Sequence, residues 1–250
     1  MDESRTQHEK EIGETKACWG RKALLRESYH NFHLEIKERL SPRSGGIAEL
    51  GSGIGMIKET IPECITTDLF PNPMVDQVED AYALSFADQT IANLILFDVW
   101  HHLEYPGSAL EEFSRVLVPQ GRVILFEPAA LSALGRFVFG YFHHEPIHDA
   151  NELRWHMPSE RDKKDLPYYA AQGNAWKMFR SGSLPEAFYA DWEIREVKFY
   201  PAFDWLAAGG FRGRQLCPSC FGGALRWASA MGSFFPALFA TRMLVVLERR

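Results

Sequence analysis

A glycine-rich turn at residues 47–55 constrains the fold of this chain more than any other feature. The segment reads Ile-Ala-Glu-Leu-Gly-Ser-Gly-Ile-Gly, and residues 56–60 then resume with a pattern that suits a helix. Glycines at such a turn let backbone N–H groups and a helix N-terminus approach a ligand, because they carry no side chain and tolerate positive φ. The segment therefore predicts a strand, a tight ligand-binding turn and the start of a helix.

Strand and helix patterns alternate after this turn. Expected strands cover 47–50, 64–69, 75–78, 91–99 and 122–127, and expected helices follow residue 55 and cover 106–117. The run 91–99 is almost continuously apolar, which is typical of a central parallel strand buried on both faces. Short connections between alternating strands and helices predict a parallel sheet with right-handed crossovers.

The two ends of the chain carry looser patterns. Residues 1–16 are polar and charged, so we expect a flexible tail there. Apolar residues at helical spacing predict one or two amphipathic helices within 17–42. Beyond residue 128 we expect helices at 131–142 and 173–180, and strands at 192–200 and 242–248. No linker divides the pattern, and residues 17–250 are expected to form a single domain.

The composition narrows the classes of function. The chain has 250 residues, a net charge of −6 and 46% hydrophobic residues, which is typical of a globular protein. A nucleic-acid partner is not expected, because such proteins usually present a basic surface. The four cysteines are too scattered for a disulfide framework and no signal segment precedes them, so we expect a cytoplasmic protein.

Acidic residues stand at the expected ends of the strands. Glu49 precedes the first glycine, Asp68 ends the second strand, Asp80 and Ala81 follow the third, and residues 97–102 end the fourth. In an open parallel sheet the ligand lies across the carboxyl ends of the strands. An acid at the end of the second strand can accept both hydroxyls of a ribose, and Asp80 can accept from an adenine amino group while Ala81 supplies an N–H.

The position of Glu49 indicates the charge of the ligand. A carboxylate beside the glycine turn suits a cationic ligand and repels a diphosphate. The main alternative is a nicotinamide dinucleotide site, whose fingerprint has a third glycine where this chain has Met56. These two residues therefore disfavour a dehydrogenase.

From about residue 47 to residue 128 the chain resembles the class I S-adenosylmethionine-dependent methyltransferases that act on small molecules. The resemblance rests on the glycine motif at 49–55, on Asp68, on Asp80-Ala81 with the segment 84–88, and on the segment 114–122. It implies an α/β, doubly wound, Rossmann-like sheet of seven strands, mostly parallel with an antiparallel last strand.

The resemblance also implies which part of the domain each segment of the chain forms. N-terminal helices would occupy 17–42, the cofactor-binding core 46–128, substrate-side elements 129–240 and the last strand 241–249. The cofactor would be S-adenosylmethionine. The implied cofactor contacts are Glu49, Gly51, Gly53 and Gly55 near the methionine part, Asp68, Leu69, Asp80 and Ala81 near the ribose and adenine, and Phe97, which with His101 would close the pocket.

Histidines supply the candidates for proton transfer. His101 and His102 follow the fourth strand, and we expect one of them, His102 by preference, to be a general base if the acceptor is a hydroxyl. They could instead only shape the pocket or cap the next helix. A second group, His143, His144 and Glu145, could contact the acceptor or form a polar loop, and His143 is a third catalytic candidate.

No metal site is expected. His143, His144 and Glu145 lack a fourth ligand at fixed spacing, and adjacent histidines point in different directions. Cys217 and Cys220 lack the second pair that a structural zinc site needs.

The methyl acceptor is the least determined part. We expect O-methylation of a small molecule, with the many aromatic residues of 129–240 suiting a saccharide or a lipid-linked acceptor. The apolar segment 227–241 is too short to span a bilayer but could sit at a membrane surface, or it could be a buried helix. The alternative is a methyltransferase-like protein that binds the cofactor without catalysis, or that serves as a partner subunit.

Overall fold

The seven strands form one mixed sheet, described here from a computed structural model that covers residues 2–143, 145–148, 154–158, 168–182 and 184–250. The strands are β1 (Gly46–Leu50), β2 (Ile65–Asp68), β3 (Gln77–Val78), β4 (Ile91–Phe97), β5 (Leu117–Pro128), β6 (Trp192–Tyr200) and β7 (Arg242–Arg249). Their order is β3-β2-β1-β4-β5-β7-β6, with β7 antiparallel to both of its neighbours and the first five strands parallel. The predicted fold class is confirmed.

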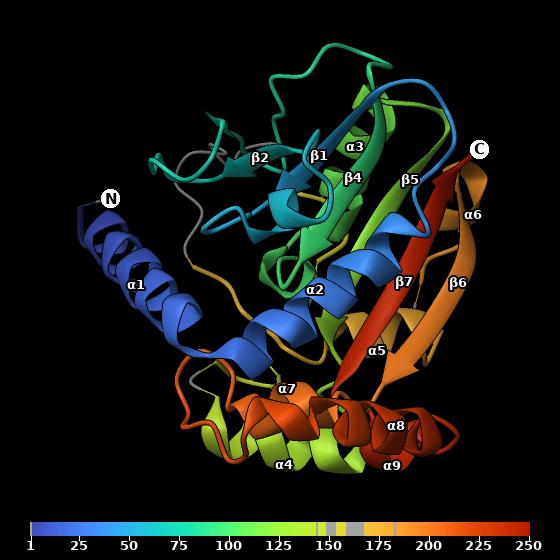
Figure 1. Ribbon diagram of the computed structural model, residues 1–250. Helices are drawn as coiled ribbons and strands as arrows, with labels where there is room; N and C mark the ends of the chain where they lie inside the picture. Colours follow the sequence, from blue (N-terminus) through green and yellow to red (C-terminus); the bar gives the residue numbers. More distant parts are fainter. Residues whose placement is uncertain (1, 144, 149–153, 159–167, 183) are drawn as a thin grey trace.

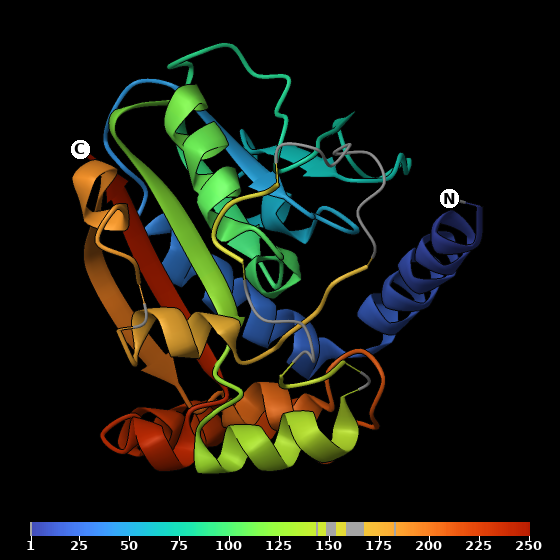
Figure 2. The same cartoon turned by 180° about the vertical axis from the view of Figure 1, so that it is seen from behind.

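Helices cover both faces of the sheet (Figures 1 and 2). They are α1 (Asp2–Arg21), α2 (Ala23–Lys37), α3 (Pro106–Val116), α4 (Ala133–Phe142), α5 (Asn174–Phe179), α6 (Phe188–Asp191), α7 (Phe203–Ala208), α8 (Gly222–Gly232) and α9 (Pro236–Phe239), with short 3₁₀ turns η1 (Met56–Glu59), η2 (Trp100–His102) and η4 (Ser219–Phe221). Figure 1 shows α2 in front of the sheet, whereas Figure 2 shows α3 in front of it on the opposite face.

The two-residue period of the strands divides the core between these faces. Along β4, Leu94 and Leu96 pack with α3 and α5, whereas Ile95 and Phe97 pack with α2. All four side chains are buried, and burying one of this size stabilises the fold by roughly 1.5–3 kcal/mol. This burial on both faces explains why the fourth strand reads as a continuous apolar run.

Helix α1 extends over the segment for which a flexible tail is predicted. It runs from Asp2 to Arg21, and its C-terminal part is held by the buried Cys18 and by Trp19, whose Nε1 donates to Glu59 at 3.3 Å. A polar sequence rich in Glu and Lys has high helix propensity, so one packed end is enough to continue the helix outward. The prediction considered polarity alone and missed this anchoring.

The segment 119–121, which falls between the predicted helix 106–117 and the predicted strand 122–127, lies within β5. Gln120 has a positive φ of 62°, and the register with β4 shifts between Ile91 and Asn93. A Cβ on Gly121 would lie 2.8 Å from the Val118 carbonyl oxygen. The turn residues therefore form an irregularity at the start of a longer strand.

A layer of helices lies beyond the carboxyl ends of the central strands. Helix α4 follows β5, α7 follows β6, and α8 and α9 precede β7, so all four gather at one edge of the sheet (Figure 1). This layer contains much of the predicted substrate-side insertion. Within the residues described, no helix is long and apolar enough to cross a membrane.

Candidate active site

The glycine turn after β1 has the backbone that the sequence predicts. Gly51, Gly53 and Gly55 have φ values of 69°, 56° and 68°, in the left-handed region that favours glycine. A Cβ on Gly51 would lie 2.5 Å from Cγ2 of Val99, whereas one on Gly53 would meet nothing closer than 3.9 Å, in Ile12 of α1. Gly51 therefore permits close packing against the end of β4, and Gly53 leaves open space beside the turn.

Glu49 carries a buried carboxyl oxygen without a hydrogen bond. Its side chain is buried, and Oε2 has no partner among the described residues. Burial, with a smaller contribution from the nearby Asp68, raises the pKa of Glu49 to about 7. A buried, unpartnered carboxyl beside open glycine backbone fits a cationic group, because a cation would satisfy the oxygen and favour its charged form.

The end of β2 is tied to the glycine turn through Asp68. Its Oδ2 accepts from the backbone N–H of Gly53 at 3.1 Å, and its Oδ1 accepts from the N–H of Leu69 at 2.8 Å. Leu69 is half exposed, next to the carboxylate. The structure therefore brings together the glycine turn and the acidic strand end, which are separate motifs in the sequence.

Asp80 and Ala81 follow β3 in a short turn. Oδ1 of Asp80 accepts from the N–H of Tyr82 at 2.9 Å, and Asp80 also forms an isolated bridge with Ala83. Both predicted contact residues are only partly buried. They follow β3, the edge strand of the sheet.

Phe97 lies in an aromatic stack on the α2 face of the sheet. Its ring centroid is 5.2 Å from that of Tyr29 and 4.8 Å from that of Phe126, in stacked geometry. The alternation of β4 directs this ring into the core, below the loop that follows the strand. The structure shows that Phe97 packs in the core, and its contact with the cofactor stays a prediction.

Glu127, at the end of β5, holds the loop that follows β4. Oε1 accepts from the N–H groups of Val99 and Trp100 at 2.8 and 2.7 Å, and Oε2 lies 2.7 Å from Nδ1 of His101. The carboxylate is fully buried. This residue is absent from the predicted site, although an acid at the end of a buried strand is the same signal that identifies Asp68.

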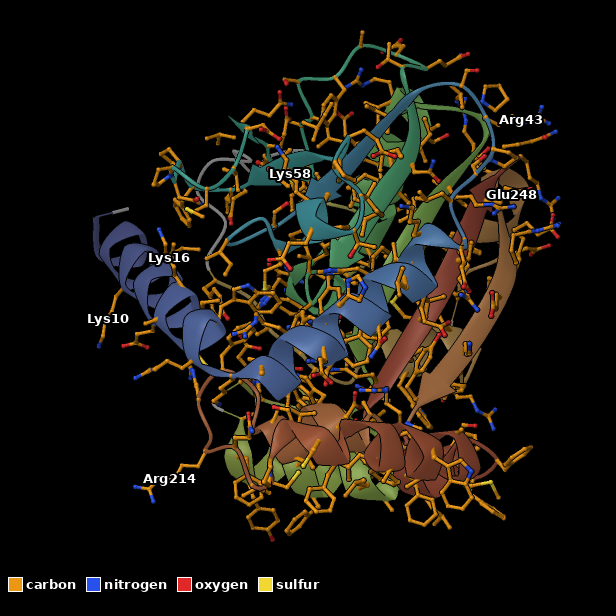
Figure 3. The ribbon with its side chains drawn as sticks, in the orientation of Figure 1. Lys10, Lys16, Arg43, Lys58, Arg214 and Glu248 are labelled. Carbon is orange, nitrogen blue, oxygen red and sulfur yellow. The ribbon has the colours of Figure 1, made fainter. Side chains whose placement is uncertain are left out.

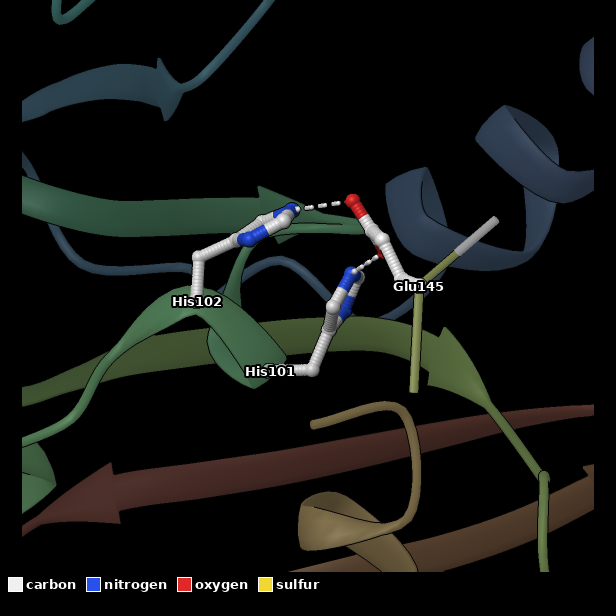
Figure 4. A group of neighbouring side chains, drawn as sticks. All are labelled: His101, His102 and Glu145. Atoms are coloured by element: carbon white, nitrogen blue, oxygen red, sulfur yellow. Dashed lines mark ion pairs between the residues drawn. The ribbon is translucent and has the colours of Figure 1, made fainter. Parts of the chain in front are cut away.

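His101 lies between two carboxylates. Besides the Glu127 contact, its Nε2 is 3.4 Å from Oε2 of Glu145 (Figure 4). Burial works to lower the pKa of His101, but the two carboxylates outweigh it and raise the pKa to about 10. The pKa of Glu145 is correspondingly held well below its usual value despite burial. At neutral pH His101 is therefore a charged member of an ion-pair network, and it is unsuited to accept a proton.

His102 has the opposite character. Its Nδ1 lies 3.0 Å from the carbonyl oxygen of Tyr169, so Nδ1 carries the proton and Nε2 keeps its lone pair. Burial and the adjacent charged His101 lower its pKa. Nε2 is 3.7 Å from Oε1 of Glu145, and the side chain remains 30% exposed. His102 is therefore a neutral, partly exposed histidine whose Nε2 can accept a proton.

The two histidine motifs of the sequence thus converge on Glu145. His143 lies just beyond α4, exposed, with Nδ1 3.8 Å from Oε2 of Glu145 and accepting from its backbone N–H at 3.3 Å. Tyr168 and Gln172 also donate to the Glu145 carboxylate. His144, the other member of the predicted motif, lies outside the described residues.

One group of side chains could hold a metal ion in the described part of the chain. Nε2 or Nδ1 atoms of His101 and His102 and an oxygen of Glu145 all lie within 4.8 Å of one another. Two histidines and a carboxylate suit a divalent transition metal, but the same atoms already form the ion pair described above. Cys217 and Cys220 are both free thiols.

Comparisons with known proteins agree with this geometry. Residues 49–125 match the sequence model of a family described as a methyltransferase domain. No curated protein matches the chain in sequence. The chain spans 61% of a candidate S-adenosylmethionine-dependent methyltransferase from Methanococcus maripaludis, with 45% of this chain covered, 16% identity and a TM-score of 0.36.

Two solved structures cover nearly the whole chain. One comes from the complex between the Haloferax volcanii Trm112 methyltransferase activator and its candidate methyltransferase, with 14% identity, a TM-score of 0.52, and 98% of this chain and 96% of that chain covered. A methyltransferase from Thermotoga maritima has 14% identity and a TM-score of 0.50, with 96% and 98% covered. At these identities the likeness concerns the fold.

The matched segment, the order of the strands and the glycine turn define a class I methyltransferase fold. Residues 49–125 match the model of a methyltransferase domain, which agrees with the predicted class and with the predicted cofactor. The predicted fold class is confirmed. The roles of individual site residues stay predictions.

Proposed function

We propose that this protein transfers a methyl group from S-adenosylmethionine to a hydroxyl of a small-molecule acceptor. The single observation that carries the proposal is His102, a neutral and partly exposed histidine at the carboxyl end of β4 whose Nε2 keeps its lone pair. It lies on the edge of the sheet that also holds the glycine turn and Glu49.

The described residues fit the cofactor. Glu49 would pair with the ammonium group of its methionine part, and the open backbone at Gly53 would accommodate that part closely. Asp68 would accept from the ribose, and Leu69, Asp80 and Ala81 would line the adenine. When bound, S-adenosylmethionine supplies a methyl group that its sulfonium already activates.

The protein's own residues would contribute by positioning the acceptor and accepting its proton. Alignment of acceptor and methyl group can supply about 7–11 kcal/mol of the barrier. His102 Nε2 would accept the hydroxyl proton, and its Nδ1–H, donated to the Tyr169 carbonyl, fixes the tautomer. The network of Glu127, His101 and Glu145 would hold the loop in place and stabilise the imidazolium that forms, because Glu145 lies 3.7 Å away.

The acceptor class follows from the surroundings of this site. Tyr168 lies with its ring 5.4 Å from that of His102 and is exposed. An exposed aromatic ring beside the base suits stacking against a sugar ring or an apolar chain. We therefore propose a saccharide or lipid-linked acceptor.

A second candidate is a non-catalytic binder or partner subunit. The Haloferax volcanii structure is a complex with an activator protein, and this observation supports a protein partner for the present chain as a second candidate. The paired His101 and the neutral His102 argue for catalysis, because a binder has no need of a base at this position.

The test compares the wild type and two variants by cofactor turnover on a panel of hydroxyl acceptors. His102→Gln should lower kcat by about 10²–10⁴-fold, the usual contribution of a general base, with unchanged affinity for S-adenosylmethionine in calorimetry. His143→Gln is the matched control, because His143 is exposed and lies on the same cluster. Full activity of His102→Gln would refute the base role. Tight cofactor binding with no turnover on any acceptor would favour the non-catalytic candidate.

A further inference from the structure

The helical layer beyond the carboxyl edge of the sheet exposes an unusual number of large apolar side chains. They belong to α4 and to the α8–α9 segment, and we call them the apolar face: Phe137, Tyr141, Phe142, Trp227, Met231, Phe234, Phe235, Leu238 and Phe239. Trp227 is 69% exposed, Phe234 73% and Tyr141 78%. Exposed aromatic residues gathered in this way mark an interaction surface.

Helix α8 buries few of its own residues. Its buried positions are Gly222 and Gly232, which approach Leu24 of α2 and Pro201 and Phe203 near α7. Trp227 and Met231 lie one turn apart and both face outward. A helix that only stabilised the core would bury its large apolar residues. The outward position of Trp227 and Met231 therefore indicates a surface that contacts something outside the chain.

The apolar face is built from separate segments of the chain that pack together. In α4 the ring of Phe137 lies 5.4 Å from Tyr141 and 5.7 Å from Phe142. Helix α4 packs against α9, and α8 packs against α7, so the exposed residues share one layer (Figure 2). Phe139, on the inner side of α4, stacks instead on Trp205 of α7 and fixes the layer to the protein.

Charge on these segments is of one sign. Residues 129–142 and 205–247 contain no Asp, Glu or Lys, but they contain five arginines: Arg136, Arg212, Arg214, Arg226 and Arg242. Arg136, Arg212 and Arg214 are exposed, and Arg214 projects from the loop that precedes α8 (Figure 3). Arg226 pairs with Glu27 of α2, and the buried Arg242 pairs with Asp98. The exposed positive charge of this layer therefore belongs to Arg136, Arg212 and Arg214, on a chain whose net charge is −6.

We propose that the apolar face docks on an anionic lipid bilayer. Aromatic side chains on short helices, flanked by arginines and free of carboxylates, match the interface between lipid headgroups and acyl chains. Anionic headgroups attract the arginines and repel the rest of this acidic chain, which selects one orientation. The carboxyl edge of the sheet, with His102, then faces the membrane surface.

Vesicle co-sedimentation with the full-length chain tests this proposal. Vesicles of phosphatidylcholine with about a third phosphatidylglycerol should bind the protein. Pure phosphatidylcholine vesicles should bind it several-fold less, because each arginine near an anionic surface raises the affinity about five-fold. The double variant Trp227→Glu/Phe234→Glu should bind at least about ten-fold more weakly. Arg136→Gln/Arg214→Gln should lose the dependence on phosphatidylglycerol.

The matched control is Tyr189→Glu, which alters an exposed aromatic residue of α6, outside the apolar layer. It should bind vesicles as the wild type does. Calorimetry with S-adenosylmethionine should give the same affinity for every variant, which separates this proposal from the proposed methyl transfer. The proposal fails if the wild type does not bind the anionic vesicles, or if the double glutamate variant binds as well as the wild type. It also fails if light scattering shows that the face only joins two copies of the chain.

Discussion

Nε2 of His101 lies 3.4 Å from Oε2 of Glu145, and this contact joins two loops that the sequence separates. Glu145→Gln removes one of the two carboxylates that charge His101. We expect the pKa of His101 to fall from about 10, and the free energy of unfolding at pH 7 to fall by about 3 kcal/mol, because a buried charge loses a partner. Urea unfolding and a histidine NMR titration measure both.

The pH dependence of this pair has a definite sign. A histidine whose pKa is raised on folding contributes stability that is complete below its unfolded pKa of 6.5 and is lost as pH rises through about 10. The pKa of Glu145 is lowered, so its contribution is lost as pH falls below the unfolded value. Glu111→Gln is the control, because the Glu111–His156 pair is exposed and should contribute less than about 1 kcal/mol. An equal loss in both variants would show that the His101–Glu145 pair has no special role.

Glu49→Gln should have opposite effects on stability and on cofactor affinity. The pKa of Glu49 is raised to about 7, so the stability associated with its neutral form is complete below about 4.5 and is lost as pH rises through 7. The glutamine variant without cofactor should therefore be more stable than the wild type at pH 8, by at most about 3 kcal/mol, and equally stable at pH 4.5. Its affinity for S-adenosylmethionine should fall about ten-fold or more, because the carboxylate no longer meets the cation.

Thermal unfolding at the two pH values, with calorimetry at pH 8, measures both effects. In the wild type, affinity should also weaken as pH falls below 7, since protonation removes the same charge. A glutamine variant that binds as tightly as the wild type would overturn the assignment of Glu49 to the cationic part of the cofactor.

Asp68→Ala should weaken the binding of S-adenosylmethionine by about 10–100-fold, because the ribose hydroxyls would lose a charged acceptor. The same carboxylate accepts from the N–H groups of Gly53 and Leu69, so the alanine variant also loosens the glycine turn. Asp68→Asn separates the two roles, since it keeps one oxygen for the backbone and removes the charge. Unchanged affinity in both variants, measured by calorimetry, would refute the ribose contact.

Removal of divalent metals should leave turnover unchanged. His101 is protonated in the pair with Glu145, and a protonated ring offers no lone pair to an ion. Dialysis against EDTA, followed by elemental analysis and a turnover assay, checks this expectation. A bound metal at about one equivalent, with activity lost on chelation and restored by zinc or manganese, would instead assign His101, His102 and Glu145 as ligands.

The strand ends that carry the proposed cofactor contacts were predictable because their determinants are local. Gly51, Gly53 and Asp68 each mark the end of a strand by residue type alone, and the parallel sheet brings strand ends together. The predicted strands agree with β1, β2 and β4 within two residues at each end, because buried parallel strands have an unmistakable apolar pattern.

The other half depends on contacts between distant segments. Nothing in the local sequence of Glu127 or Glu145 specifies that both reach His101, so the ion-pair network could not be predicted. The outward orientation of α8 was equally hidden, because an apolar helix reads the same whether its large residues face the core or the solvent. Helix α1 was missed for a related reason, since its anchoring at Trp19 depends on Glu59.

Glu127 has a consequence for the order in which the site forms. Its carboxylate belongs to β5, yet it fixes the backbone of Val99 and Trp100 and the ring of His101, which follow β4. The loop after β4 therefore takes its shape only after β5 has paired with β4, and in synthesis the ribosome must add β5 before that loop can settle. A nascent chain that ends before residue 127 can contain the whole glycine turn and still lack the ordered loop that carries His101 and His102.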